Sequence, residues 1–349
     1  MVKVGFLFPQ MMGIGGAERW LAGLLKGLSE HPVELVGVAV RGDIPVEDRQ
    51  VVNTQRYCPV WVGAAGLDRV CAASDVLVTW GTQHVLNEWV GPHREKGLKV
   101  VLTAHSLKPM CCHSAHEEAA DYLVAVSEAA RAFFPAHAQF KVRVIHPGVE
   151  VDRVTPTRPR EDLRRTLGYG PTDRVVGYLG RYSDEKNPLA VTMGVPTLGP
   201  GWHALMVGAG PLTGALCQSI DGLPYGRHQV MPAVERPGDA LAAMDCLVVP
   251  SHYESYCLSA VEAWLAGVPL VMTPTGVRAE FEPRFGPLCS PIPFSPNPQE
   301  LADAVQRAVH PAFMGIADKA RRLAWGHLTA SATGRVWAEL LAEIGPRKR

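Results

Sequence analysis

The chain has 349 residues, more than a single hydrophobic core usually serves, so its length favours two domains. Its 34 Lys and Arg residues balance 34 Asp and Glu residues, and this zero net charge gives no support for a large polyanionic partner. No apolar run reaches the ~18 residues that span a bilayer. The first apolar run, residues 2–8, ends at Pro9, unlike a secretory signal. The eight cysteines are irregularly spaced, which favours reduced thiols, and we expect a cytoplasmic protein without stable membrane insertion.

Short apolar runs alternate with helical patterns along the chain, which is typical of βαβ units that form parallel sheets. The first series of predicted strands comprises residues 2–8, 33–40, 76–80, 99–103, 122–126 and 142–145. The segment 150–162 is rich in proline and charge and resembles a linker. The second series comprises residues 175–179, 202–207, 228–231, 246–249 and 269–273. We therefore predict two doubly wound α/β domains, at 1–150 and 151–322.

A helical pattern covers residues 317–344 near the end of the chain. We expect the segment 323–349 to be helical and to pack back on the N-terminal domain. The positions predicted to be buried in this pattern are Trp325, Val336, Trp337, Leu340 and Leu341.

A Gly-rich segment, Gly13 to Glu18, follows the first predicted strand and opens a helix. Ligands of doubly wound sheets bind beyond the carboxyl ends of the strands, and glycines there let an anion approach the helix N-terminus. We interpret the segment as a candidate phosphate cradle, and the alternative is a Gly-rich turn without a ligand. Glu18 stands where a dinucleotide fingerprint needs Gly or Ala, which argues against an oxidoreductase.

Two carboxylates flank the start of the helix that follows strand 246–249. Glu254 lies in the loop and Glu262 one turn into the helix, so both can face a ligand at the helix N-terminus, whose N–H groups suit a diphosphate. Carboxylate oxygens also accept well from the vicinal hydroxyls of a sugar or a ribose. The alternative is that Ser259 to Glu262 forms a capping box, in which Glu262 only caps its helix.

Two cations, Arg181 and Lys186, follow the predicted strand 175–179. Together they can neutralise a diphosphate, Arg as a planar fork and Lys as a point charge. A charged loop is usually only solvated, but this one shares a sheet edge with Glu254, which supports a binding role. We expect both side chains to face solvent in the free protein.

A Cys/His cluster, Cys111, Cys112, His113 and His116, offers zinc-ligand chemistry. Adjacent cysteines rarely share one tetrahedral ion, and no second Cys/His pair lies at finger spacing, so we favour a loop on the acceptor side. The chain has no Asp-x-Asp motif, and we expect neither a metal nor another cofactor.

Several motifs run through the chain in an order known from one enzyme family. They are Gly15-Gly16-Ala17-Glu18, Leu102 to His105, Val124 to Ser127, Ile145 to Val149, Gly180-Arg181 with Lys186, Val207 to Pro211, and the pair Glu254 and Glu262. In these motifs the chain resembles the retaining GT-B glycosyltransferases of family 4 (glycosyl transferases group 1), which include sucrose synthase-like and phosphatidylinositol mannosyltransferase-like enzymes. The resemblance implies two Rossmann-like domains facing across a cleft. It also implies metal-independent transfer of a hexose, with retention, from a UDP- or GDP-linked sugar to a hydroxyl.

The resemblance also implies roles for individual residues. Arg181 and Lys186 would bind the donor diphosphate, Glu254 the sugar hydroxyls, Glu262 the ribose, and His105 the transferred sugar. Further donor contacts are implied at Gly15, Gly16, Gly180, Met231, Pro232, Ala233, Ser255, Tyr256, Cys257 and Leu258. Tyr256-Cys257 replaces the Phe-Gly that is usual in the family, which leaves the identity of the donor open.

The acceptor stays open between a small molecule, a glycan, a lipid-linked sugar and a modified nucleic acid. We expect loops at 51–67, 82–93 and 107–116 to recognise it. Two other functions remain: a sugar-nucleotide epimerase or hydrolase of the same fold, and a nucleotide-sugar-binding protein that has lost transfer. The joint presence of the five residues assigned to catalysis and to the ribose disfavours loss of activity.

Overall fold

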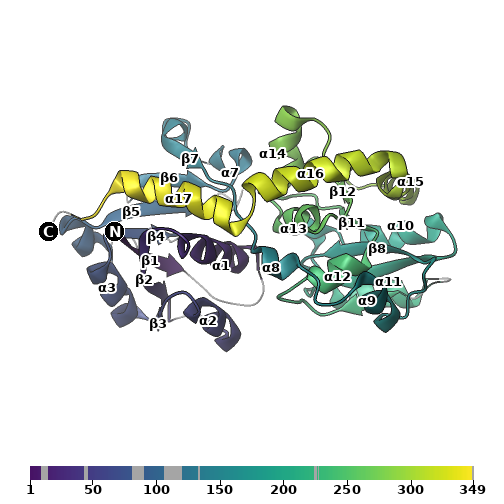
Figure 1. Cartoon of the computed structure of the whole chain (residues 1–349), viewed down its shortest axis with the longest axis horizontal. Coiled ribbons are helices and arrows are strands. Elements are labelled where there is room, and N and C mark those ends of the chain that lie inside the picture. The colour runs from purple at the N-terminus through teal and green to yellow at the C-terminus, as the bar shows by residue number, and fades with distance from the viewer. Residues whose placement is uncertain are drawn as a thin grey trace. The chain divides into compact units, whose positions relative to one another are not determined.

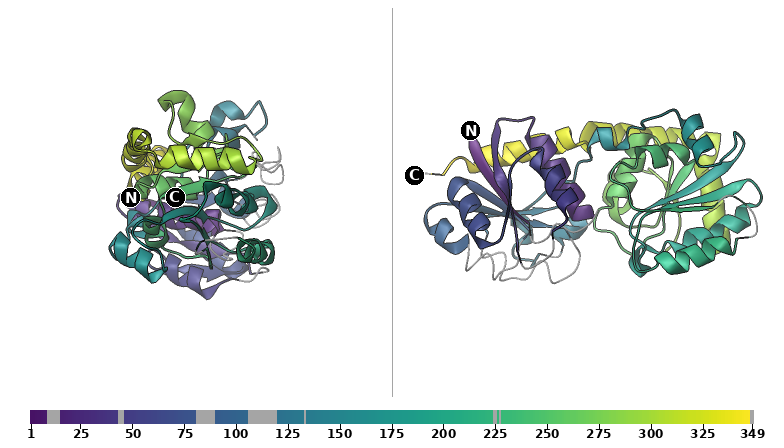
Figure 2. Two further views of the ribbon diagram at one scale, coloured as in Figure 1. Left: turned by 90° about the vertical axis from the view of Figure 1, so that its right-hand side faces the viewer. Right: turned by 90° about the horizontal axis from the view of Figure 1, so that it is seen from below.

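The computed structural model describes residues 1–8, 15–42, 46–80, 90–105, 120–132, 134–223, 226 and 228–347. Its chain divides into two compact units. Unit 1 comprises Met1–Glu150 and Leu328–Arg349, and unit 2 comprises Val151–His327. Each unit contains one parallel β-sheet flanked by helices (Figures 1 and 2). Among the described residues, no helix is long and apolar enough to cross a membrane.

The sheet of unit 1 has the strand order β3-β2-β1-β4-β5-β6-β7. Its strands are β1 (Val2–Phe8), β2 (Val33–Val40), β3 (Val60–Val62), β4 (Val76–Thr79), β5 (Lys99–Ala104), β6 (Tyr122–Ala125) and β7 (Val142–Val144). The six predicted strands are present to within one residue at each end. The short edge strand β3 was not predicted, because three residues carry too little pattern. The strand order reverses between β1 and β4, so this unit's topological switch point lies there.

The sheet of unit 2 has the order β10-β9-β8-β11-β12-β13. Its strands are β8 (Arg174–Leu179), β9 (Trp202–Val207), β10 (Gln229–Met231), β11 (Cys246–Val249), β12 (Leu270–Met272) and β13 (Ser290–Pro291). Only the two-residue strand β13 was not predicted. The strand order reverses between β8 and β11, which places the switch point of this unit between these two neighbours.

Helices occupy the connections between the strands of both units (Figure 1). Those of unit 1 are α1 (Gly16–Leu28), α2 (Asp48–Gln55), α3 (Ala64–Ala73), α5 (Gly91–Glu95), α7 (Glu128–Arg131) and α17 (Ala330–Ile344). Those of unit 2 are α8 (Val151–Val154), α9 (Arg160–Thr166), α10 (Leu189–Gly194), α11 (Thr213–Asp221), α12 (Gly238–Ala243), α13 (Leu258–Ala266), α14 (Gly276–Phe285), α15 (Pro298–Val309) and α16 (Met314–His327). Because helices cover the sheets, strands such as β4 and β11 are buried along their whole length.

An aspartate joins the two strands at each switch point. Asp75, just before β4, accepts a hydrogen bond from the Lys3 N–H in β1 at 2.9 Å. Asp245, just before β11, accepts one from the Val175 N–H in β8 at 2.7 Å. Each carboxylate satisfies a backbone donor at the amino ends of the strands. The carboxyl ends, where ligands of such sheets bind, are the opposite edge.

The predicted linker at 150–162 is not a linker. It contains α8 and the first turn of α9. Asp239 in α12 fixes the intervening chain, because it accepts from the Thr157 N–H at 2.6 Å and from the Thr157 hydroxyl at 2.7 Å. The prolines mark the ends of short helices, and Pro159 is the N-cap residue of α9.

The helical pattern at 317–344 is divided between α16 and α17, which are separated by Leu328 and Thr329. Burial of Trp337, Leu340 and Leu341 is confirmed, and the Trp337 ring lies 6.3 Å from that of Trp20 in α1. The prediction is wrong for Trp325 and Val336, whose side chains are 46% and 45% exposed. The break changes the helical phase, so one periodic pattern cannot give the buried face of both helices.

Helix α17 returns to unit 1 and packs against α1 (Figure 1). Two glycines, Gly27 in α1 and Gly334 in α17, permit this close approach. A Cβ on Gly27 would lie 2.8 Å from the Gly334 Cα atom. A larger residue at either position would therefore push the helices apart.

Candidate functional site

The loops that follow β8 and β11 meet at the switch point of unit 2. Gly180 to Lys186 follows β8, and Ser251 to Cys257 follows β11. These strands are adjacent and parallel, so their carboxyl ends lie at one sheet edge. Two motifs that are about 70 residues apart in the sequence therefore form one candidate site.

An ion pair joins these loops. The Lys186 ammonium lies 2.8 Å from Glu254 Oε2, and it donates to the Tyr253 carbonyl at 3.4 Å. The two charged side chains are 22% and 11% exposed. Burial lowers the pKa of Lys186, but the Glu254 carboxylate and, to a lesser extent, Cys257 and Glu185 raise it, and the pKa lies above its ordinary value. The expectation that Lys186 faces solvent is wrong, because its charge is directed at Glu254.

Hydroxyl groups hold Glu254 from both sides. The Ser251 hydroxyl donates to Glu254 Oε1 at 2.9 Å. The Thr275 hydroxyl accepts from the Glu254 N–H at 2.9 Å and donates to the Glu254 carbonyl at 3.1 Å. The Thr273 hydroxyl donates to the Ser251 carbonyl at 2.7 Å. The carboxylate is thus fixed before any ligand arrives, by residues that sequence reasoning missed; their signal was a run of hydroxyl residues after β11 and β12.

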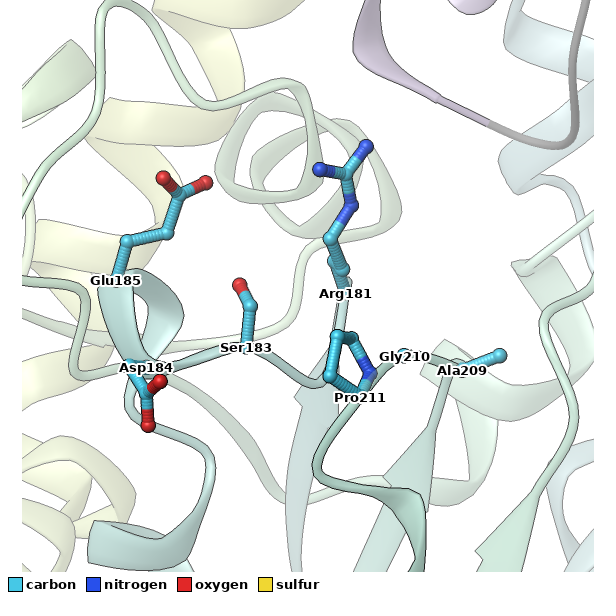
Figure 3. A pocket seen from close by; sticks show the side chains of 7 residues that line it. All are labelled: Arg181, Ser183, Asp184, Glu185, Ala209, Gly210 and Pro211. Carbon is cyan, nitrogen blue, oxygen red and sulfur yellow. The ribbon is translucent and has the colours of Figure 1, made fainter.

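Arg181 lies at the edge of a hollow of about 600 Å³ (Figure 3). The hollow is lined by Arg181, Ser183, Asp184, Glu185, Ala209, Gly210 and Pro211. In Figure 3 the side chains of Arg181, Ser183 and Glu185 extend to the same side of the loop, whereas that of Asp184 points away. Arg181 is exposed, as expected, and within the described ranges its guanidinium has no ion-pair partner. The site therefore contains two cations, Lys186 in an ion pair with Glu254 and the exposed Arg181.

Glycines allow the strand-end loops beside Arg181 to approach closely. A Cβ on Gly210 would collide with the Tyr182 carbonyl oxygen, and one on Gly208 would collide with the Gly180 carbonyl oxygen. The Gly208 N–H donates to the Met231 carbonyl at 3.0 Å, which ties the end of β10 to this loop. Pro232 and Ala233 continue from there, with Pro232 exposed and Ala233 half-buried.

Cys257 has an unusual backbone conformation at the start of α13. Its φ is 79° and its ψ is 81°, in the left-handed region that favours glycine. The side chain is buried, with Sγ 3.4 Å from the Ser259 hydroxyl oxygen, and burial raises the pKa of the thiol to about 12. A neutral, buried thiol therefore occupies the position of the usual glycine, next to the first helical residue, Leu258.

Tyr256 presents only its backbone to this edge. Its side chain is buried and packs edge-on against Phe281, with ring centroids 6.4 Å apart. Its carbonyl accepts from the Val277 N–H at 2.7 Å. Ser255, the residue before it, is half-buried. A ligand here would meet the chain between Ser255 and Leu258 mainly through backbone groups.

Glu262 does not cap its helix. The N-cap residue of α13 is Cys257, and Ser259 is already inside the helix, so the capping-box alternative is wrong. The Glu262 side chain is 1% exposed, and its Oε1 lies 3.8 Å from Nη2 of Arg153 in α8. Arg153 was not among the residues predicted from the sequence.

Unit 1 carries the predicted Gly15 and Gly16 at the N-terminus of α1. The Glu18 carboxylate folds back over Gly15, because a Cβ there would collide with Glu18 Oε2, whereas a Cβ on Gly16 would meet open space. A negative charge thus already lies at this helix N-terminus, which weakens the phosphate-cradle interpretation. Gly13 and Ile14 lie outside the described residues.

His105 lies between two tryptophans at the end of β5. Its ring centroid is 4.2 Å from that of Trp20 and 5.4 Å from that of Trp80. Nε2 lies 2.9 Å from the Thr103 hydroxyl oxygen, whose proton goes to the Thr79 carbonyl, so Nε2 is assigned as the donor. Burial lowers the pKa of His105 to about 3, so the imidazole is neutral near pH 7. Trp80, at the end of β4, was missed because one aromatic residue after a strand carries no distinctive signal.

Some predicted features lie outside the described residues. They are the Cys/His cluster of Cys111, Cys112, His113 and His116, the acceptor loop 107–116, and most of the acceptor loop 82–93. In the part of the chain that the structure describes, no group of His, Cys, Asp and Glu side chains is arranged to hold a metal ion.

Solved structures resemble this chain over both units. The Anabaena HepE structure in complex with UDP and glucose has a TM-score of 0.81 at 21% identity, covering 98% of this chain and 100% of that one. Sucrose-phosphate synthase from Thermosynechococcus elongatus has a TM-score of 0.74 at 16% identity, covering 99% of each chain. The two parallel-sheet α/β units thus define a protein of the GT-B fold.

One segment of unit 2 is similar to a known family. Residues 173–310 match the model of the glycosyl transferases group 1. The D-inositol 3-phosphate glycosyltransferase of Corynebacterium jeikeium is 33% identical over 150 residues, which cover 39% of this chain and 36% of the relative. The enzyme of the same name from Mycobacterium marinum is 34% identical over 146 residues, which cover 39% and 30%. The matched segment spans about a third of the length of these curated relatives.

Proposed function

We propose that this protein is a retaining glycosyltransferase that moves a hexose from a nucleoside-diphosphate sugar to a hydroxyl acceptor without a metal ion. The observation that carries this proposal is the Lys186–Glu254 pair at the switch point of unit 2, with the exposed Arg181 in the same loop as Lys186. The match of residues 173–310 to the glycosyl transferases group 1 supports the activity. UDP is the nucleotide we favour, because the HepE structures of the same fold contain UDP and UDP-glucose.

The donor is assigned to the carboxyl edge of unit 2. Arg181 and Lys186 bind its diphosphate, Glu254 accepts from its sugar hydroxyls, and Glu262 accepts from its ribose. Backbone groups of Gly180 and of Ser255, Tyr256, Cys257 and Leu258 meet the phosphates and sugar, and Met231, Pro232 and Ala233 flank the base. Gly15, Gly16 and His105 of unit 1 complete the proposed set.

Charge develops on the leaving phosphate as the bond to the sugar breaks. Arg181 and Lys186 stabilise that charge. Because both are in place before the reaction, no reorganisation is needed as the charge forms. Glu254 cannot be displaced easily toward the anomeric carbon, because Ser251 and Lys186 hold its two oxygens. We therefore favour same-face substitution, in which the departing phosphate accepts the acceptor's proton. His105 is neutral, so it offers the transferred sugar an N–H donor or a lone-pair acceptor rather than a positive charge.

Two measurements test this function. The melting temperature is first measured with UDP-, GDP- and ADP-linked sugars, since a ligand at 100 times its dissociation constant stabilises a protein by about 2.7 kcal/mol. The bound donor is then incubated with candidate acceptors, and the anomeric proton of the product is observed by NMR. An α product from an α donor is expected. A β product would overturn retention, and release of free nucleotide without any acceptor would favour a hydrolase or an epimerase.

The acceptor set for this screen follows from the chemistry of the proposal, which requires a hydroxyl. D-inositol 3-phosphate is one compound to include, because the related enzymes are named for it. Glycans, lipid-linked sugars and modified nucleic acids complete the screen.

A further inference from the structure

Arg153 and Glu262 form an ion pair inside unit 2. The guanidinium Nη2 lies 3.8 Å from Glu262 Oε1, and the two side chains are 15% and 1% exposed. Arg153 belongs to α8, which packs against α12 and α13. A Cβ on Gly238 in α12 would lie 2.6 Å from the Thr155 carbonyl oxygen, so α12 and the end of α8 are in close backbone contact. The helix that carries Arg153 is thus held in place by packing against α12 and α13.

A carboxylate with so little exposure is costly to bury unless a positive charge lies beside it. A carboxylate recognises two vicinal hydroxyls well, because it offers acceptors alone on both oxygens. Arg153 places its positive charge 3.8 Å from Oε1, the distance of an ion pair rather than of a hydrogen bond.

We propose that Arg153 is a positioning residue for nucleotide recognition, whose positive charge holds Glu262 where it can accept from the ribose hydroxyls of the donor. The inference rests on the proposed function, because the assignment of Glu262 to the ribose belongs to it. Arg153 acts through Glu262 and need not touch the nucleotide. Its loss should therefore affect recognition of the ribose hydroxyls more than any other part of binding.

The test compares a ribonucleotide with its 2′-deoxy form. Calorimetry first identifies which of UDP, GDP and ADP binds the wild type, and that nucleotide and its 2′-deoxy counterpart are then titrated into each variant. Arg153→Met keeps much of the side-chain length and removes the charge. We expect it to weaken binding of the ribonucleotide about tenfold, which is the effect of losing one hydrogen bond to a charged group. The affinity for the 2′-deoxy form should change little. The preference of the protein for the ribonucleotide should therefore largely disappear.

Arg236 provides a matched control. Its Nη2 donates to the Asp152 carbonyl of α8 at 2.7 Å, so it holds the same helix from another side. Arg236→Met should leave the ribose preference unchanged. In turnover assays Arg153→Met should raise KM for the donor and leave kcat nearly unchanged, and Arg153→Lys should restore part of the preference.

The outcomes separate this inference from the proposed function. Failure of the wild type to bind any of the three nucleotides would overturn the proposed function. A wild-type preference that persists in Arg153→Met, even with a lower melting temperature, would overturn the role of Arg153 alone. Arg153→Gln replaces the Met variant if that variant does not fold. As a further check, Arg153→Met should add no loss of affinity in a Glu262→Gln background, because both changes remove the same interaction.

Discussion

Lys186 and Glu254 neutralise each other at 2.8 Å across the ends of two neighbouring strands, and Lys186 thus has a structural as well as a proposed chemical role. Arg181, five residues earlier in the same loop, is exposed. The two cations should therefore respond differently to removal. This difference is the basis of the first prediction.

Lys186→Ala should lower both turnover and stability, whereas Arg181→Ala should lower turnover alone. Each change removes a group that stabilises charge on the leaving phosphate, and a loss of about a hundredfold in kcat is expected for one such group. Lys186→Ala also leaves the largely buried Glu254 without its cation, at a cost of about 1–3 kcal/mol in the free energy of unfolding. Arg181→Ala should change that free energy by less than about 0.5 kcal/mol.

Turnover with saturating donor and unfolding in urea give the two quantities. The double variant Lys186→Ala/Glu254→Gln is the control, and it should recover stability without recovering turnover. Full turnover of Lys186→Ala would remove Lys186 from the proposed chemistry.

At position 257 a glycine variant should be more stable than an alanine variant, which reverses the usual order of stability. At an ordinary position Gly is less stable than Ala by roughly 0.5–1 kcal/mol. At φ 79° and ψ 81° a side chain is strained, so Cys257→Gly should be more stable than Cys257→Ala by about 1 kcal/mol. Cys257→Val should be the least stable of the three, because β-branching increases the conflict. Thermal unfolding of the three variants measures the order, and an alanine variant at least as stable as the glycine variant would show that this backbone is not strained.

His105 should make the protein less stable in mild acid. The unfolded chain binds a proton at this group below about pH 6.5, but the folded chain does so only near pH 3, because burial lowers the pKa. The stability from neutral His105 is therefore fully present above pH 6.5 and is lost as the pH falls toward 3. Between pH 7 and pH 5 the wild type should lose about 1–2 kcal/mol more unfolding free energy than His105→Gln. Urea unfolding at both pH values measures this, and equal losses would mean that His105 is protonated in the folded protein.

Turnover should survive treatment with EDTA. The proposal gives the diphosphate two side-chain cations and backbone N–H groups, so no divalent ion is needed to hold it. Added magnesium or zinc should not stimulate the chelated enzyme. Inactivation by EDTA that either metal reverses would contradict the proposal. It would favour a metal site, for which the candidate ligands are Cys111, Cys112, His113 and His116.

Much of the fold follows from local sequence pattern. Apolar runs of strand length, separated by helical patterns, located eleven of the thirteen strands among the described residues to within one residue at each end, because strands covered on both faces are apolar throughout. The same pattern placed Arg181 and Glu254 directly after strands. In a parallel sheet that location is enough to predict that both lie at the ligand edge.

The sequence by itself thus determined the two doubly wound sheets and the edge at which the candidate site lies. Only the tertiary structure decided which side chains meet, because strand order is not encoded in the pattern of any single strand. The adjacency of β8 and β11 turns Lys186 and Glu254 into a pair, and the packing of α8 on α13 brings Arg153 to Glu262. Likewise the left-handed backbone of Cys257 is imposed by the start of α13, since a cysteine has no local preference for that conformation.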